Sequence, residues 1–164
     1  MVRNEEVTHI RTATIDDAEA ISRIVCRCYE GFAQTDGWPQ QIIAELKVVR
    51  GSEDCIRQLV AREHAFVADD GGDIRGMVSV SENEITKLFV DPDHQRQGIG
   101  RQLFAHAESF IRGRGHRRMF LGAAVQTPIG FYQKMGMTIA RTRIIDRGPC
   151  IGMTSTILEK ALGT

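Results

Sequence analysis

The chain has 164 residues and carries 21 Lys and Arg against 21 Asp and Glu, so its formal net charge at pH 7 is zero. This balance excludes a protein that relies on a long-range electrostatic field to bind nucleic acid or an anionic membrane surface. The composition, 42% hydrophobic and 26% charged, is that of a globular chain, and the length predicts a single domain over residues 1–164. We expect no nucleic-acid and no membrane partner.

Two further features narrow the class of protein. No apolar run approaches the roughly 18 residues of a membrane span, and residues 1–6 are polar, so we expect neither membrane insertion nor export. The cysteines lack the paired CxxC spacing of a zinc site, and we interpret them as buried, reduced thiols of a cytoplasmic protein without a metal. They are Cys26, Cys28, Cys55 and Cys150.

The N-terminal part of the chain predicts one strand followed by helices. Residues 8–14 alternate polar and apolar side chains as a strand does, and residues 14–17 supply N-cap candidates for an amphipathic helix. We then expect, in chain order, that helix to about Phe32, a turn-rich break at 33–37, and two shorter helices at 39–49 and 52–62. Residues 33–63 therefore form a helical insert before the next strand.

The rest of the chain alternates strands with two helices. Apolar residues keep helical spacing through 99–112, and Gly113 and Gly115 end this helix. Pro92 ends the strand before it, because proline cannot continue a central ladder. We expect strands at 65–68, 74–81, 84–90, 119–125, 137–145 and 150–158, and helices at 99–112 and 128–135. This order is of α/β type, and the crossover from the third to the fourth of these strands is expected to be parallel and right-handed.

The most informative local feature is the loop Gln95-Arg96-Gln97-Gly98-Ile99-Gly100-Arg101, between a strand and a helix. A helix N-terminus presents unpaired N–H groups and a partial positive charge, so backbone donors can bind a pyrophosphate there. Gly98 and Gly100 remove side chains that would keep phosphates away from those amides. Arg96 and Arg101 can add charge-assisted contacts.

This loop alone does not identify a ligand. One alternative is a structural loop whose glycines only allow tight packing. Two other nucleotide-binding motifs are excluded. A P-loop requires Lys and then Ser or Thr after the second glycine, where this chain has Arg101-Gln102, and a dinucleotide fingerprint requires a third glycine, where it has Leu103.

Several segments together resemble the GNAT superfamily of acetyl-CoA-dependent N-acetyltransferases. Leu88-Phe89-Val90-Asp91-Pro92, followed by the loop at 95–101, is similar to the family's acetyl-CoA-binding pattern Gln/Arg-x-x-Gly-x-Gly/Ala. Phe131-Tyr132-Gln133-Lys134-Met135-Gly136-Met137 is similar to its Phe-Tyr-x-Lys-x-Gly-Phe stretch. The likeness extends more loosely to residues 10–18 and 157–162, and it is weakest over 33–63.

The resemblance implies a GNAT fold, an α/β domain with a central, mixed and mostly antiparallel sheet of about six to seven strands and helices on both faces. It also implies acetyl-CoA as co-substrate. In the family, the loop amides hold the CoA pyrophosphate, and the backbone of the preceding strand pairs with the pantetheine arm. These roles correspond to residues 95–101 and to Leu88, Phe89 and Val90. A split at the end of this strand is expected to receive the pantetheine between strands.

The resemblance also assigns a catalytic role to Tyr132. Acetyl transfer from a thioester needs a neutral amine, a proton donor for the departing thiolate and stabilisation of the oxyanion. In the resembling enzymes the tyrosine of this motif points to the CoA sulfur and protonates it. The alternative is a tyrosine that only packs in the core beside Phe131.

Glu84 is the candidate general base, acting through water, since it begins the strand that corresponds to the pantetheine strand and family members often carry an acid there. The alternative is an exposed carboxylate at a strand end. We expect His94 to be a solvated loop histidine. One position departs from the family: many relatives have Asn or Ser before the tyrosine helix, where this chain offers Gln126 or Thr127 as substitutes.

The resulting hypothesis is an enzyme that transfers the acetyl group of acetyl-CoA to a primary amine by direct attack in a ternary complex. The acceptor is a small molecule or, as a variant, a protein or peptide amine. Residues 33–63, which include Trp38, are expected to shape the acceptor side. The alternative is a non-catalytic acyl-CoA-binding sensor or interaction module, which would not need Tyr132. Monomer and homodimer both stay open.

Overall fold

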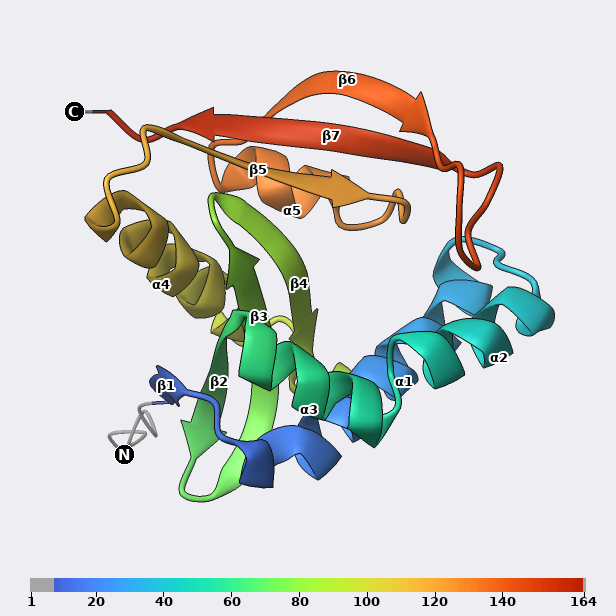
Figure 1. Cartoon of the computed structure of the whole chain (residues 1–164), viewed down its shortest axis with the longest axis horizontal. Coiled ribbons are helices and arrows are strands. Elements are labelled where there is room, and N and C mark those ends of the chain that lie inside the picture. Colours follow the sequence, from blue (N-terminus) through green and yellow to red (C-terminus); the bar gives the residue numbers. More distant parts are fainter. Residues whose placement is uncertain (1–7, 164) are drawn as a thin grey trace, which may run out of the picture.

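Seven strands form one sheet in the order β1-β2-β3-β4-β5-β7-β6 in the computed structural model, which describes residues 8–163 (Figure 1). The strands are β1 (His9–Thr12), β2 (His64–Asp70), β3 (Asp73–Ser81), β4 (Glu84–Val90), β5 (Arg118–Ala123), β6 (Thr138–Ile144) and β7 (Thr154–Ala161). The helices are α1 (Ala18–Thr35), α2 (Gln40–Val49), α3 (Glu53–Arg62), α4 (Ile99–Gly113) and α5 (Ile129–Lys134), with short 3-10 turns η1 (Ile15–Asp17) and η2 (Pro92–His94). The predicted α/β fold, with a sheet of six to seven strands, is confirmed.

The sheet consists of two antiparallel parts joined by one parallel contact. Strands β1 to β4 pair antiparallel with their neighbours, and β7 pairs antiparallel with both β5 and β6. Between the two parts, β4 and β5 run parallel, as predicted for this crossover, with the register Glu84 to Phe120. The two parts therefore diverge from this contact, as the arrangement in Figure 1 shows.

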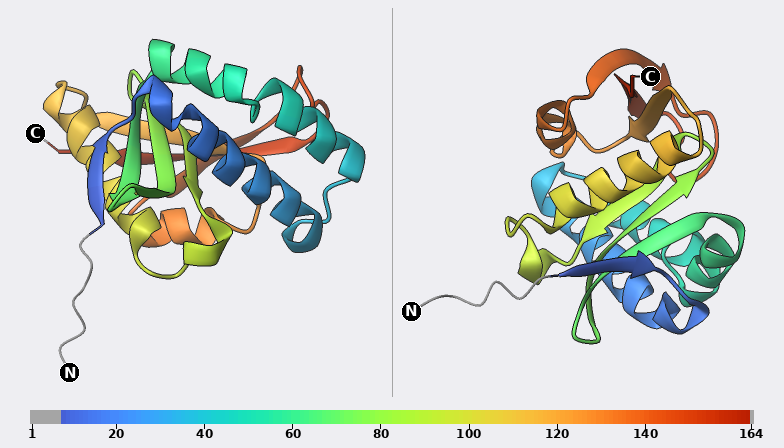
Figure 2. Two further views of the ribbon diagram at one scale, coloured as in Figure 1. Left: turned by 90° about the horizontal axis from the view of Figure 1, so that it is seen from below. Right: turned by 90° about the vertical axis from the view of Figure 1, so that its left-hand side faces the viewer.

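Helices cover both faces of the sheet, and the alternation of side chains along the strands explains how. On β3, Met77 packs into a core with α1, α2 and α3, whereas Val78 and Val80 pack into a second core with α4 and α5. Successive side chains of a strand point to opposite faces, so one strand supplies both cores. Figure 2 shows α1 to α3 on one side of the sheet and α4 and α5 on the other.

Two predicted boundaries were wrong, and each has a local cause. The break predicted at 33–37 begins only after Thr35, because the helix continues until Gly37 adopts a left-handed φ of 67°. The last strand begins at Thr154 instead of residue 150. Residues 145–153 form a closed loop in which Ile145 N–H donates to Met153 O (2.9 Å) and Gly152 N–H donates to Ile145 O (2.8 Å).

The structure also bears on the state of the cysteines, on membrane-spanning helices and on metal-binding clusters. All four cysteines are free thiols; Cys28 and Cys150 are buried as expected, whereas Cys26 and Cys55 are partly exposed. Within residues 8–163, no helix combines the length and apolar character that crossing a membrane requires. The same residues contain no group of three or more His, Cys, Asp or Glu arranged to hold a metal ion.

Gly76 of β3 provides a test of the packing between the sheet and α4. A Cβ atom at this position would lie 2.9 Å from Leu103 Cδ1 and 3.0 Å from the Phe89 carbonyl oxygen. We expect Gly76→Ala to lower the free energy of unfolding by about 1–3 kcal/mol, because the backbone oxygen cannot move aside. Urea denaturation measures this change.

Gly113, the last residue of α4, is the matched control for this substitution. A Cβ atom there would meet no atom within 4 Å. We expect Gly113→Ala to leave the stability unchanged or to raise it by up to about 1 kcal/mol, since alanine favours the helix. Equal effects of the two substitutions would contradict the close approach at Gly76.

Candidate functional site

A cleft of about 570 Å³ lies where β4 and β5 separate. Among the described residues, Glu84 with Phe120 is the single registered pair between these strands, so beyond it both strands line the cleft from opposite sides. The lining includes residues 84–90 of β4, residues 121–125 at the end of β5, and side chains of α1 and α5. An edge of β4 without a strand partner presents backbone groups to which an extended ligand can hydrogen-bond.

A β-bulge in β4 changes which side chains reach the cleft. Lys87 lies opposite Ser79, whereas Ile85 lies opposite the next residue, Val80, so Thr86 is an extra residue on β4. A bulge bends its strand and redirects the side chains around it. Thr86 and Lys87, adjacent in sequence, both line the cleft as a result.

The loop at 95–98 leads into α4 through two left-handed residues. Gly98 is the N-cap residue with φ 84°, and Arg96 has φ 63°, which is uncommon for a residue with a side chain. The first hydrogen bond of the helix runs from Gln102 N–H to Gly98 O (3.1 Å), so the preceding amides have no acceptor within the helix. Successive amides in such a turn form an anion-binding concavity.

The two glycines of the loop differ in what they contribute. A Cβ atom on Gly98 would meet no atom within 4 Å, so glycine is needed there for its φ angle and not for space. A Cβ atom on Gly100 would contact the Phe131 ring at 3.5 Å and Val90 Cγ2 at 3.6 Å, which are ordinary distances. The protein therefore has space for a Cβ atom at both positions, but only at Gly98 does the backbone conformation disfavour a side chain.

The remaining residues of the loop lie differently from one another. Gln95 lines the cleft, and its side-chain amide donates to the Val90 carbonyl (3.2 Å). The Ile99 side chain is buried in the core below α4, so only its backbone is available to a ligand. Arg96, Gln97 and Arg101 are exposed, and within the described chain neither arginine forms an ion pair.

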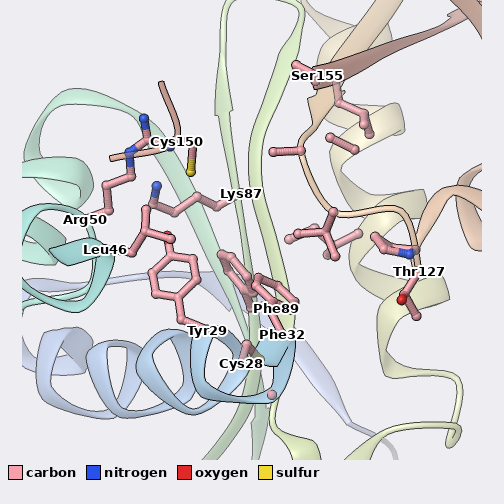
Figure 3. A pocket seen from close by; sticks show the side chains of 18 of the residues that line it. Cys28, Tyr29, Phe32, Leu46, Arg50, Lys87, Phe89, Thr127, Cys150 and Ser155 are labelled. Carbon is pink, nitrogen blue, oxygen red and sulfur yellow. The ribbon is translucent and has the colours of Figure 1, made fainter. Parts of the chain in front are cut away.

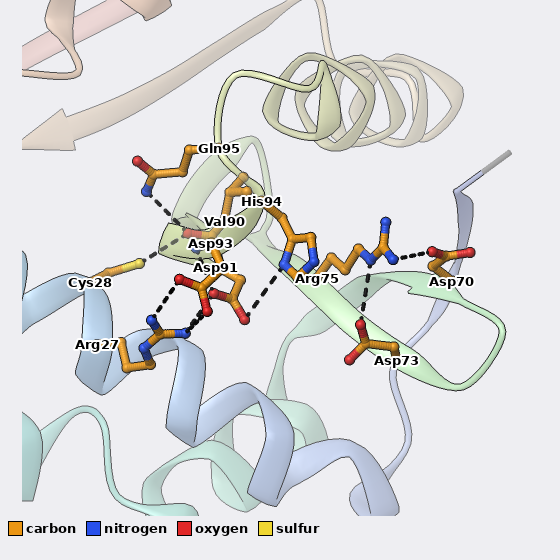
Figure 4. Close-up of polar contacts among 10 residues, drawn as sticks. All are labelled: Arg27, Cys28, Asp70, Asp73, Arg75, Val90, Asp91, Asp93, His94 and Gln95. Carbon is orange, nitrogen blue, oxygen red and sulfur yellow. Dashed lines mark hydrogen bonds and ion pairs between the residues drawn. The ribbon is translucent and has the colours of Figure 1, made fainter. Parts of the chain in front are cut away.

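Helix α1 anchors the loop that follows β4 (Figure 4). The Arg27 guanidinium contacts Asp91 Oδ1 (2.7 Å) and Asp93 Oδ1 (3.1 Å), and the neighbouring Cys28 thiol donates to the Val90 carbonyl (3.3 Å). These contacts hold the end of β4 and the turn that leads into the loop at 95–98 in place. Sequence reasoning missed Arg27, because its partners lie more than 60 positions away.

His94 differs from the expected solvated loop histidine. Its side chain is 25% exposed, and its Nδ1 atom is buried, 3.9 Å from Asp91 Oδ2. No described residue hydrogen-bonds to Nδ1. His94 thus belongs to the anchored turn η2.

Helix α1 also holds the turn between β5 and α5. The Asp36 carboxylate accepts hydrogen bonds from the backbone N–H groups of Gln126 (2.9 Å) and Thr127 (3.3 Å) and from the Thr127 hydroxyl (2.9 Å). Of the two residues predicted as substitutes at this turn, Thr127 lines the cleft and Gln126 is exposed. Asp36 was not predicted, since a carboxylate at a helix end carries no signal of a partner 90 residues away.

Tyr132 of α5 is 8% exposed and still lines the cleft. Its ring packs against Phe131, with centroids 5.4 Å apart, and against Phe104 at 6.5 Å. Burial raises the pKa of its hydroxyl to about 12, so the group is a neutral phenol at physiological pH. No described residue hydrogen-bonds to this hydroxyl, which leaves its proton available to a ligand in the cleft.

Glu84 lies at the closed end of the cleft, where β4 and β5 still pair. Burial and then the nearby charge of Glu63 raise the pKa of the Glu84 carboxyl, while the charge of Arg143 opposes this shift. Glu84 is half-buried, which disagrees with the alternative of an exposed strand-end carboxylate, while its role as a base stays a prediction. Glu84 and Tyr132 line the same cleft although 48 positions separate them in the sequence.

Comparisons with known proteins agree with this architecture. Residues 61–138 match the family model of the acetyltransferase (GNAT) domain. An uncharacterized N-acetyltransferase of Methanocaldococcus jannaschii is 27% identical over 135 residues, which are 77% of this chain and 59% of the relative. The chain thus spans less than two thirds of that relative's length.

Solved structures share the fold across nearly the whole chain. A GCN5-related N-acetyltransferase of Rhodopseudomonas palustris superposes with a TM-score of 0.84 at 17% identity, covering 94% of this chain and 95% of that one. The PaiA N-acetyltransferase of Thermoplasma acidophilum, solved in complex with coenzyme A, gives a TM-score of 0.73 at 18% identity, covering 93% and 98%. Residues 61–138 are thus similar to the acetyltransferase (GNAT) domain, and the whole chain, with its sheet divided between β4 and β5, has the fold of these solved N-acetyltransferases.

Proposed function

We propose that the chain transfers the acetyl group of acetyl-CoA to a primary amine by direct attack in a ternary complex. The observation that carries this proposal is the cleft between β4 and β5, with the N-terminus of α4 beside its open end and the neutral hydroxyl of Tyr132 in its wall. A non-catalytic acyl-CoA sensor would have no use for an unpartnered phenol at this place. The PaiA structure with coenzyme A supports the choice of donor.

The residues present suit coenzyme A. Amides at 96–101 lie at the start of a fifteen-residue helix in a turn with two left-handed residues, an arrangement that favours the pyrophosphate. The exposed Arg96 and Arg101 can add charge-assisted bonds to its oxygens. Leu88, Phe89 and Val90 line the diverging edge, where an extended pantetheine arm can pair with the backbone.

In the reaction, the amine nitrogen bonds to the thioester carbonyl carbon and the carbon–sulfur bond breaks. The amine must lose a proton, and the departing thiolate must gain one. We assign the first proton to Glu84, through a water molecule, and the second to the hydroxyl of Tyr132. The assignment follows the different environments of the two groups, a half-buried carboxylate and a phenol that burial keeps neutral.

Gly98 tests the binding of acetyl-CoA. We expect Gly98→Val to weaken binding roughly tenfold or more, because a β-branched residue is strained at φ 84° and the loop amides shift with it. Gly98→Asn is the matched control, since asparagine tolerates this conformation and should bind nearly as the parent protein does. Isothermal titration calorimetry with acetyl-CoA measures both, and equal affinities for all three proteins would remove the loop assignment.

Tyr132→Phe tests the proton donor. We expect kcat to fall about a hundredfold, because the thiolate then leaves without a positioned acid. The affinity for acetyl-CoA should change by less than threefold in calorimetry, since phenylalanine preserves the packing against Phe131. Steady-state thiol release measures kcat, and full activity of the variant would rule out this role.

Glu84→Gln tests the base. Because burial and the charge of Glu63 raise the pKa of Glu84, its carboxylate is present above that raised pKa and is lost as the pH falls through it. The parent enzyme should therefore lose kcat/KM on the acid side, and the variant should lack this limb and run about a hundredfold slower at neutral pH. Glu82→Gln, two residues away in the exposed turn before β4, should keep the parent pH profile. An unchanged acid limb in Glu84→Gln would assign the titration to another group.

A further inference from the structure

Two cations that form no ion pair within the described chain line the cleft opposite the turn that carries Thr127. Lys87 projects from β4, and Arg50 follows the last residue of α2. In Figure 3 the Lys87 amine points away from the strand toward Arg50 and Cys150. Within the described chain neither cation forms an ion pair, whereas the nearby Lys47 contacts Glu30 at 2.5 Å and Arg57 contacts Glu53 at 2.6 Å.

In the protein without a ligand, the charged form of Lys87 is disfavoured at this position. Burial and then the like charge of Arg50 lower the pKa of Lys87, which means that its charged form is disfavoured there. The charge of Glu63 opposes this shift, but its carboxylate accepts a hydrogen bond from the Thr86 hydroxyl (2.6 Å) and forms no ion pair with Lys87. A partly buried cation without a partner is stabilised when a ligand supplies the negative charge.

The space around the two cations suits a compact anion. Besides the main cleft, Lys87 and Arg50 line a smaller hollow of about 240 Å³ together with Gln58 and Arg62. An anion placed between them would meet three cationic side chains and one amide. The carboxylates that face this region are Glu63 and, deeper in the main cleft, Glu84.

An apolar wall lies next to the cations. The rings of Tyr29 and Phe89 meet edge to face with centroids 5.5 Å apart, and Tyr29 and Phe32 follow at 6.0 Å. All three rings line the main cleft (Figure 3). Along β4 the order is Glu84, Lys87 and Phe89, so Lys87 lies between the candidate base and these rings.

We propose that the amine acceptor also carries a compact anionic group, a carboxylate or a phosphate, which Lys87 and Arg50 bind while the apolar part of the acceptor packs against Tyr29 and Phe89. This inference rests on the proposed acetyl transfer and names the class of acceptor for it. It favours amino-acid-like acceptors over simple alkyl amines and polyamines, whose added positive charge the two cations would repel.

Thiol release with pairs of amines tests the proposal. The pairs are phenylalanine and phenylalanine amide, leucine and leucine amide, and 2-aminoethyl phosphate and ethanolamine. Each amino-acid amide has the shape of its acid and an amine that loses its proton more readily, so faster reaction of the acid cannot come from amine acidity. We expect the anionic member of at least one pair to have a kcat/KM roughly tenfold or more above its partner. The third pair separates phosphate from carboxylate recognition.

Substitutions assign the effect to the two cations. Lys87→Met keeps the length and apolar stem of the side chain and removes its charge, so the protein should fold with equal or greater thermal stability. We expect Lys87→Met and Arg50→Gln each to move the ratio of kcat/KM within the preferred pair toward one. Arg23→Gln, which removes an exposed cation of α1 outside the cleft, should leave the ratio unchanged.

Two failures have different meanings. Equal or faster reaction of the uncharged member in all three pairs would overturn the anionic acceptor while acetyl transfer stands. If no amine reacts although acetyl-CoA binds, the proposed function fails, and calorimetry with the same pairs then decides the binding question. In that case, tighter binding of the anionic member that is lost in Lys87→Met supports the anion site, and equal binding overturns it.

Discussion

The single backbone pair between β4 and β5, Glu84 with Phe120, is the constraint on which the rest of the structure depends. Two antiparallel sheets that meet at one point must diverge beyond it. The divergence leaves one edge of β4 without a strand partner and opens the cleft that residues of both parts line. In a sheet paired along its full length, the backbone groups of this edge would be hydrogen-bonded to a neighbouring strand and unavailable to a ligand.

Helix α1 holds both sides of this opening. Near its middle, Arg27 binds Asp91 and Asp93 after β4, and just past its end Asp36 binds the turn after β5. One rigid helix of 18 residues thus fixes the separation of the two diverging strands. Because α1 contacts the segments that follow both strands, the groups assigned to catalysis can keep their relative positions.

The chemistry within the cleft follows from unequal burial. Tyr132 is a buried phenol with a raised pKa of about 12, Glu84 is a half-buried carboxylate, and Lys87 is an amine whose charge is disfavoured. The β-bulge at Thr86 has a part in this arrangement, since it places Thr86 and Lys87 on the cleft together. The proposed proton donor, base and anion site thus come from α5, β4 and the end of α2, around a single opening.

Local patterns in the sequence determined most of the elements and the loop before α4. The period of apolar residues, the glycines and the prolines act within a few positions, so the strand at 84–90, the helix from Ile99 and the glycine-containing loop before it could be predicted. Tertiary structure alone decided the extent of the split, the roles of Arg27 and Asp36, and the meeting of Lys87 with Arg50. These features depend on contacts between residues 37 to 91 positions apart, and no short-range pattern records which distant charges will become neighbours.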